Sequence, residues 1–287
     1  MAAHGRRAAA VRDAGFRMSE SLHAFDSAIA LQALGDGAWQ GHTCPSYANM
    51  IGPYGGITAA QALNAVLQHP DLLGEPVALT VNFAAALADG SFTVRPRAAR
   101  TNRSTQHWTI EVLQDEQVVV TATAITAVRR ETWGAREQPM PEVQRPHDLP
   151  CTQRRGVEWL HRYDMRFVTG SIPREWNGQD AGESLSRLWV RDEPARPLDF
   201  PSLTALADVF FPRLWLRRAK LTPLGTVSMT VYFHADSARL RATGDGYLLI
   251  QARGQGFGGG YFDHAGQLWN EAGELLATTH QVVYYKE

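Results

Sequence analysis

Residues 52–68 have the sequence GPYGGITAAQALNAVLQ, a glycine-rich loop that runs directly into an alanine-rich helical pattern. The apolar residues that recur at three- and four-residue spacing are Ile57, Ala60, Leu63 and Leu67. The centre of the segment carries no charge, which predicts a helix enclosed on most sides rather than one lying on a surface. The glycines and Pro53 exclude a regular element before this helix.

After the helix the apolar period changes from three or four residues to two. Residues 77–83, VALTVNF, alternate as expected for a strand with one buried face. Further strands are predicted at 91–102, 105–113 and 118–128, with a turn at 114–117. Thr, Val, Ile and Trp dominate these segments, which is typical of a twisted antiparallel sheet. The first half is therefore predicted to be an α+β unit.

The second half repeats this order. A helix is predicted over residues 201–211, PSLTALADVFF, because Pro201 and Ser202 are suitable start residues. The strands predicted around it cover residues 161–170, 183–192, 226–234, 247–253, 259–270 and 275–285. The tripeptides that begin at Val81 and Val231 correspond, at an offset of 231 − 81 = 150 positions. A repeat of half the chain implies two copies of one fold.

The strand at residues 226–234, TVSMTVYFH, shows the clearest alternation in the chain. Successive strand residues point to opposite faces, so the pattern predicts two sets of side chains. The first set is Val227, Met229, Val231 and Phe233. The set predicted on the other face is Thr226, Ser228, Thr230, Tyr232 and His234.

A chain of 287 residues has room for two domains. We expect an N-terminal extension (1–24), a first domain (25–130), a linker (131–156) and a second domain (157–287) that carries the active site. The linker is marked by Pro139, Pro141, Pro146 and Pro150. The Arg-rich extension has no apolar stretch of signal-peptide length, and no segment is long enough to span a membrane. The expected location is the cytoplasm, with Cys44 and Cys151 as reduced thiols.

Several function classes lack support. The formal net charge is −1, which gives no electrostatic reason to expect a nucleic-acid partner. No metal-binding motif, nucleotide loop or serine-nucleophile elbow occurs, so neither metal nor cofactor is expected. GQGFGG at residues 254–259 matches a dinucleotide fingerprint, but a strand pattern follows it where a helix is required. A glycine-rich strand that passes close to another backbone or a ligand explains it better.

Six segments together resemble one known family. They are Trp39-Gln40-Gly41, GPYGGITAAQAL (52–63), ALADVFF (205–211), GTVSMTVYFH (225–234), ARGQGFGGGYFDHAGQL (252–268) and LATTHQ (276–281). The sequence resembles the type II acyl-CoA thioesterases, which are double-hotdog proteins. The resemblance implies two fused hotdog domains, each with a central helix wrapped by an antiparallel sheet. It also implies hydrolysis of acyl-CoA to fatty acid and CoA, and further pairing of chains into a homo-oligomer.

The family's catalytic triad corresponds to Asp208, Thr226 and Gln281. The resemblance implies that these three side chains hold and activate a water molecule. Apolar residues surround Asp208 in the sequence, so burial is expected to raise its pKa and make it a better base. Ala62 and Ala65 occupy the first helix where an acidic residue would be needed, which predicts one active site per chain.

Residues expected to contact the substrate are Gly55, Gly56, Arg213, Arg217, Gly256 and Gly258. The two arginines suit CoA phosphates, although the sequence favours a solvated basic surface over this role. The family often has Asp-His in the strand after the catalytic Thr, whereas Val227, Ser228 and Met229 stand here. This departure leaves an alternative open, in which the protein binds acyl-CoA or an acyl chain without cleaving it.

Overall fold

The computed structural model describes residues 22–152 and 156–287, so most of the expected N-terminal extension lies outside the described residues. The first half contains α1 (Ala24–Ile29), β1 (Gln32–Gly35), β2 (Ala38–His42), α2 (Gly55–Leu67), β3 (Glu75–Phe83), β4 (Ser91–Thr101), β5 (Thr105–Gln114) and β6 (Gln117–Ala127). The second half contains β7 (Tyr163–Thr169), β8 (Ser186–Asp192), α3 (Phe200–Leu206), α4 (Arg213–Arg218), β9 (Leu224–Phe233), α5 (Ser237–Thr243), β10 (Leu248–Arg253), β11 (Phe257–Gly258), β12 (Tyr261–Asn270) and β13 (Leu275–Tyr285).

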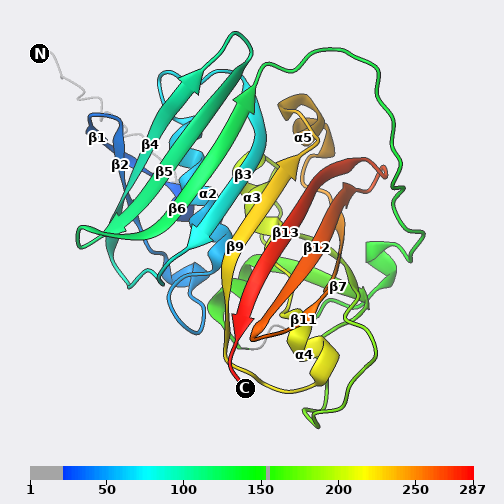
Figure 1. Cartoon of the computed structure of the whole chain (residues 1–287). Helices are drawn as coiled ribbons and strands as arrows, with labels where there is room; N and C mark the ends of the chain where they lie inside the picture. The colour runs from blue at the N-terminus through cyan, green and yellow to red at the C-terminus, as the bar shows by residue number, and fades with distance from the viewer. Residues whose placement is uncertain (1–21, 153–155) are drawn as a thin grey trace, which may run out of the picture.

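These strands form one 13-stranded antiparallel sheet. Its order is β1-β2-β4-β5-β6-β3-β9-β13-β12-β10-β8-β7, with β11 beside β12. The strands of the first half occupy one end of the sheet and those of the second half the other (Figure 1). Among the described residues, β3 with β9 is the strand pair that joins the two halves, so the halves meet at the centre of the sheet.

The β3–β9 pair shows the duplication directly. Thr80 lies opposite Thr230, 150 positions later, and their Oγ1 atoms are 3.0 Å apart. Leu79 pairs with Val231 and Val81 pairs with Met229, so a shift of 150 positions exchanges these two pairs. The two halves are therefore related in space by the same offset of 150 positions that the sequence predicts.

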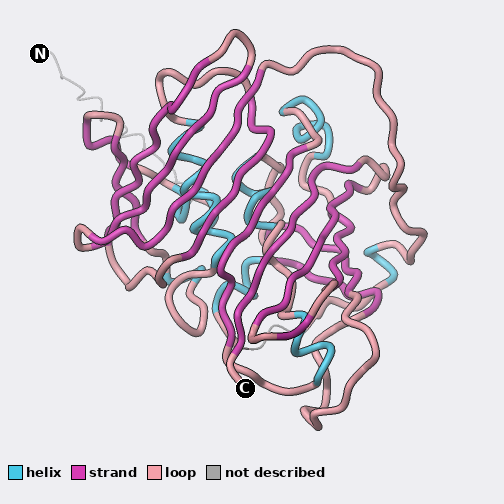
Figure 2. The backbone as a smooth tube through the Cα atoms, in the orientation of Figure 1, coloured by secondary structure: helices cyan, strands magenta, loops and turns pink. Residues whose placement is uncertain are grey.

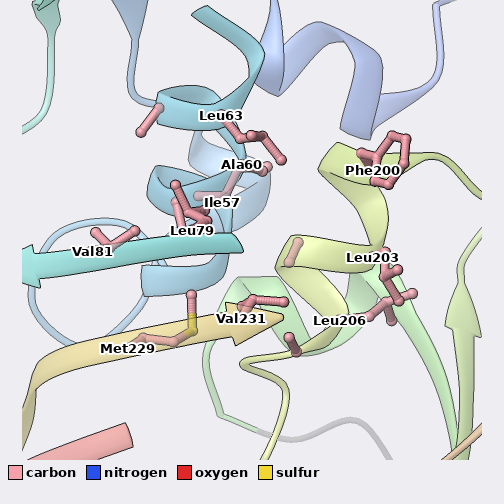
Figure 3. Packing of buried hydrophobic residues seen from close by; sticks show 14 of the residues in the cluster. Ile57, Ala60, Leu63, Leu79, Val81, Phe200, Leu203, Leu206, Met229 and Val231 are labelled. Carbon is pink, nitrogen blue, oxygen red and sulfur yellow. The ribbon is translucent and has the colours of Figure 1, made fainter. Parts of the chain in front are cut away.

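The core lies between the sheet and the helices α2 and α3, on what we call the inner face (Figure 3). Ile57 and Leu63 from α2 and Leu203 from α3 are at most 2% exposed. Opposite them lie Leu79 and Val81 of β3 and Met229 and Val231 of β9, all fully buried. The four alanines of α2 are also fully buried, as predicted for an enclosed helix: Ala59, Ala60, Ala62 and Ala65.

The second central helix is shorter than predicted. The Asp199 side chain caps its start by accepting a hydrogen bond from the Ser202 amide at 2.8 Å. The helix ends at Leu206, so Asp208 lies in the turn directly after it and not on the helix. The physical reason is the sequence that follows: β-branched Val209, two aromatic residues and then Pro212, which disfavours helical backbone at the residue before it.

The proline-rich connection is packed against the protein, although Figure 2 shows it mainly as loop. Its residues 140–149, which we call the linker strap, lie on the outer face of the second half. Met140, Val143 and Leu149 pack against a separate apolar cluster of Trp189, Tyr247, Leu249 and Trp269. The Trp189 indole N–H also donates to the Gln144 carbonyl at 2.8 Å. The strap therefore covers apolar surface that the sheet alone leaves open.

Two further expectations concern the cysteines and membrane-spanning segments. Cys44 and Cys151 are not joined to each other by a disulfide. None of the helices in the described part of the chain has the length and apolar character that crossing a membrane requires.

Candidate active site

The structure brings Asp208, Thr226 and Gln281 together. The Gln281 Nε2 group donates to Asp208 Oδ1 at 2.7 Å, and the Thr226 hydroxyl donates to Gln281 Oε1 at 3.5 Å. The Gly56 backbone N–H also donates to the Asp208 carboxylate. Gln281 is 3% exposed, whereas Asp208 and Thr226 remain partly accessible to solvent. One amide therefore orients both other side chains while leaving them reachable from outside.

A β-bulge in β9 determines where Thr226 points. In the register with β13, Val282 pairs with Ser228 but Val283 pairs with Thr226, which leaves Val227 as an extra residue. A bulge of this kind reverses the alternation of the strand beyond it. The predicted faces are therefore wrong at this end: Val227 is 36% exposed, and Thr226 lies on the inner face with Gln281.

The first half of the chain completes the site through the start of α2. The Tyr54 hydroxyl donates to the Ala205 carbonyl at 2.6 Å, which joins the start of α2 to the end of α3. A Cβ atom on Gly56 would lie 2.7 Å from that same carbonyl oxygen, so only glycine fits there. A Cβ atom on Gly55 would lie 2.9 Å from Asp208 Oδ2. Both glycines that the sequence indicates as substrate contacts thus lie at the carboxylate.

The surroundings of Asp208 favour its protonated form. Burial raises the pKa of Asp208 to about 7, although hydrogen bonds from Gln281 and the Gly56 amide act in the opposite direction. The expectation of a raised pKa is therefore confirmed, and it arises from desolvation. A carboxylate that titrates near neutral pH is suited to removing a proton from water.

The two arginines predicted as CoA contacts are engaged elsewhere. Arg213 is 0% exposed and donates to the carbonyls of Phe211, Ser184 and Ala252 and to the Ser186 hydroxyl. A guanidinium enclosed in this way cannot reach a phosphate at the surface, so it is a structural residue. Arg217 lies in an ion pair with Asp180, with Nε and Oδ1 2.8 Å apart. Neither arginine is brought to Asp208.

Gly256 and Gly258 are also not brought to Asp208. Both are exposed, in the hairpin that follows β10. The Gly256 N–H donates to Asp263 Oδ1 at 2.9 Å, and Asp263 alternates with the inner-facing His264 along β12. The glycine-rich segment makes its closest approach at Gly254, where a Cβ atom would lie 2.5 Å from the Phe257 ring. The dinucleotide alternative is excluded here because a strand, β12, follows the glycines.

Two inner-face residues beside the site were missed at the level of sequence. Tyr54 stands within the quoted GPYGG loop, and His264 stands within the quoted segment at residues 252–268. The signal for His264 was available, because it shares its alternation along β12 with the buried residues Phe262 and Leu268. No cluster of three or more metal-ligating side chains occurs among residues 22–152 and 156–287.

Two family models match the chain, one over each half. The acyl-CoA thioesterase N-terminal domain matches residues 44–127, and the acyl-CoA thioesterase C-terminal domain matches residues 135–285. The chain belongs to the acyl-CoA thioesterase family. It is thus a thioester hydrolase, and the family expected from the sequence is confirmed. No curated protein matches the chain at a significant level.

Solved structures agree on the fold. A conserved hotdog-fold protein of unknown function from Alicyclobacillus acidocaldarius is 44% identical, with a TM-score of 0.88, over 93% of this chain and 99% of that one. The tesB protein of Mycobacterium avium subs paratuberculosis is 19% identical, with a TM-score of 0.75, over 93% and 100% of the two chains. Acyl-CoA thioesterase II TesB2 from Mycobacterium marinum is 19% identical, with a TM-score of 0.70, over 92% and 98%. The double hotdog fold is confirmed.

The raised pKa of Asp208 makes stability depend on pH. The unfolded carboxyl titrates near pH 4, so its stabilising contribution is fully present below that pH and is lost as the pH rises through about 7. Asp208→Asn removes this titration. We expect the variant to gain about 2 kcal/mol on the wild type between pH 4 and pH 8, allowing for partial solvent exposure. Equilibrium denaturation across that range measures the difference.

Asp89, an exposed carboxylate before β4, supplies the matched control. Asp89→Asn should follow the wild-type stability curve at every pH. A difference between Asp208→Asn and the wild type that stays constant from pH 4 to pH 8 would contradict the assigned titration.

Proposed function

We propose that this protein hydrolyses acyl-CoA to free fatty acid and CoA, through one water molecule activated by Asp208, Thr226 and Gln281. The observation that carries the proposal is the 2.7 Å hydrogen bond between Gln281 and Asp208, whose pKa lies near 7. A thioester carbonyl is already activated and a thiolate leaves easily. A positioned water and a base therefore suffice, without a nucleophilic side chain.

Asp208 acts as the general base. Its carboxylate removes a proton from the water while the oxygen of that water adds to the thioester carbonyl carbon. The Thr226 hydroxyl and the Gln281 amide fix the orientation of the water and of the carboxylate. When the tetrahedral intermediate collapses, the carbon–sulfur bond breaks and Asp208 returns its proton to the departing sulfur, so CoA leaves as a thiol and the carboxylate is regenerated.

The start of α2 supports the developing negative charge on the carbonyl oxygen. The first amides of a helix have no carbonyl four residues earlier to bind, and the helix dipole makes this end positive. Gly56 N–H is already directed to the Asp208 carboxylate, so Gly55 N–H is the remaining donor beside it. One such donor is typically worth about 10²–10³ in rate.

The expected setting follows the resemblance to the family. We propose a cytoplasmic enzyme that assembles as a homo-oligomer, with acyl-CoA as its small-molecule partner and without a metal or cofactor. The pseudo-symmetric arrangement supports one site per chain, because Asp208 has no acidic counterpart among the residues of α2.

The proposal predicts release of free thiol from acyl-CoA. Wild-type protein is mixed with acyl-CoAs from C4 to C16 and a thiol reagent, and Asp208→Asn should lower kcat by at least about 10². Binding without thiol release at any chain length would instead support the alternative, a protein that holds acyl-CoA without cleaving it. Wild-type rates in Asp208→Asn would remove Asp208 from the mechanism.

The pH dependence of catalysis follows from the same carboxylate. Only the ionised form of Asp208 can accept a proton, so kcat/KM should rise about tenfold per pH unit below about 7 and level off above it. Initial rates on one acyl-CoA in buffers of constant ionic strength test this. A flat profile from pH 5 to pH 8 would show that another group provides the base.

Gly55→Ala separates the position of Asp208 from its chemistry. The added methyl would lie 2.9 Å from Asp208 Oδ2, the end of a side chain, so the carboxylate must move while the fold is retained. We expect kcat to fall about 10-fold or more with little change in Tm, since small displacements at a reacting centre are costly. Gly134→Ala is the matched control, because its Cβ atom meets nothing within 4 Å. Equal activity of the two variants would argue against the proposed geometry.

A further inference from the structure

His264 is a buried histidine directly beside the catalytic residues. It lies opposite Gln281 in the β12–β13 pair and is 3% exposed. Its ring meets the Phe210 ring edge-on, with centroids 5.5 Å apart. Neither ring nitrogen has a hydrogen-bond partner among the described residues. Burial and the nearby Arg213 charge lower the pKa of His264 to about 3, so the ring is neutral and carries one donor and one acceptor.

Thr279 places a third unpartnered polar atom on the same buried face of the sheet. It precedes Gln281 by two residues on β13, so both point to the inner face. Thr279 is 3% exposed, and its Oγ1 has no partner in the described part of the chain. Its methyl group occupies the space above Gly266, where a Cβ atom would lie 2.8 Å from Thr279 Cγ2 and 3.1 Å from Phe210. Gly266 thus allows Thr279 and Phe210 to close around His264.

These unpartnered groups reduce the stability of the protein without a substrate. Native structures rarely leave buried donors or acceptors unpaired, because each has given up water without a replacement. Here a donor, an acceptor and a hydroxyl lie within two residues of Gln281 along or across the strands. Such a cluster beside a reacting centre is suited to a ligand that supplies the missing hydrogen bonds.

The charge of Arg213 influences which kind of ligand atom is favoured beside His264. Its guanidinium donates to carbonyls and a hydroxyl. Its remaining hydrogen bonds also go to main-chain carbonyls, those of Ala252 and Phe211. The Cζ atom of Arg213 lies 5.7 Å from the centre of the Phe210 ring. The positive charge beside Phe210 favours a ligand with an electronegative atom over a purely apolar chain.

We infer that His264 and Thr279 select acyl-CoA substrates that carry a hydroxyl group on the acyl chain, an inference that rests on the proposed thioesterase function. An alcohol can donate its proton to the imidazole acceptor and accept one from Thr279 at the same time. A keto oxygen can only accept, and an unsubstituted chain can do neither. Selection therefore follows the order hydroxyl, keto, unsubstituted.

The register limits where on the chain the hydroxyl lies. Residues directly opposite in an antiparallel pair have Cβ atoms about 4.5–5.5 Å apart, so His264 is one side chain away from Gln281. Gln281 orients the group that activates the water, and the water attacks the thioester carbonyl. The hydroxyl that His264 contacts is consequently on one of the first carbons after that carbonyl.

The test compares four substrates of equal length: butyryl-CoA, 2-hydroxybutyryl-CoA, 3-hydroxybutyryl-CoA and acetoacetyl-CoA. We expect the better hydroxybutyryl substrate to exceed butyryl-CoA at least about 10-fold in wild-type kcat/KM, the size expected when one buried hydrogen bond is gained. In His264→Leu this ratio should fall to about 1. His107→Leu, at an exposed histidine on β5, should keep the wild-type ratio.

Thr279→Val guards against a result that reflects folding alone. Valine keeps the shape and removes only the unpartnered hydroxyl, so Tm should rise while the hydroxyl preference falls at least about threefold. A variant that loses both stability and preference would point to a structural role and overturn the inference. So would a wild-type ratio near 1, or a ratio that survives in His264→Leu, as expected if buried water alone occupies these groups.

Calorimetry separates this inference from the proposed reaction. Dissociation constants for butyryl-CoA and the two hydroxybutyryl-CoAs are measured with Asp208→Asn, with and without His264→Leu. A hydroxyl preference in binding that requires His264 supports the inference even if the wild type releases no thiol, which would overturn hydrolysis alone. Turnover of all four substrates without a preference in rate or binding retains the thioesterase and overturns the role of His264.

Discussion

The contact between the start of α2 and the end of α3 determines the rest of the site. Tyr54 binds the Ala205 carbonyl, and Gly56 donates to Asp208 two residues beyond the helix end. The first half therefore contributes the helix start whose amide binds the carboxylate, and the second half contributes the carboxylate itself. The position of the carboxylate thus depends on both halves, which the β3–β9 pair joins into one continuous sheet.

Much of this arrangement could be predicted from the sequence because it depends on periodicity. The enclosed helix after residue 54, the long strands and the offset of 150 all follow from the spacing of apolar residues. Features that interrupt the periodicity could not be predicted from the sequence. The bulge at Val227 changes one residue of register, and only pairing with β13 reveals it. For the same reason Thr226 was predicted on the wrong face even though its selection as a site residue came from the family motif.

The site was predictable where a residue's role depends on its neighbours in sequence, and unpredictable where it depends on what encloses it. The apolar neighbours of Asp208 were enough to anticipate a raised pKa. Arg213 also looked suggestive in sequence, because it follows the Asp208 segment closely, yet the fold surrounds it with main-chain carbonyls. Gly256, by contrast, lies in an exposed hairpin, where its N–H binds Asp263 and not Asp208.

The linker strap changes what counts as the second half of the molecule. In sequence, residues 140–149 separate the two repeats, but in space they pack over Trp189 of β8 and Trp269 of β12. A fragment that starts at residue 157 would expose Trp189 and Trp269 to water, and an exposed apolar patch of this kind promotes aggregation. A fragment of the second half therefore needs residues 140–149 as well to keep this apolar cluster covered.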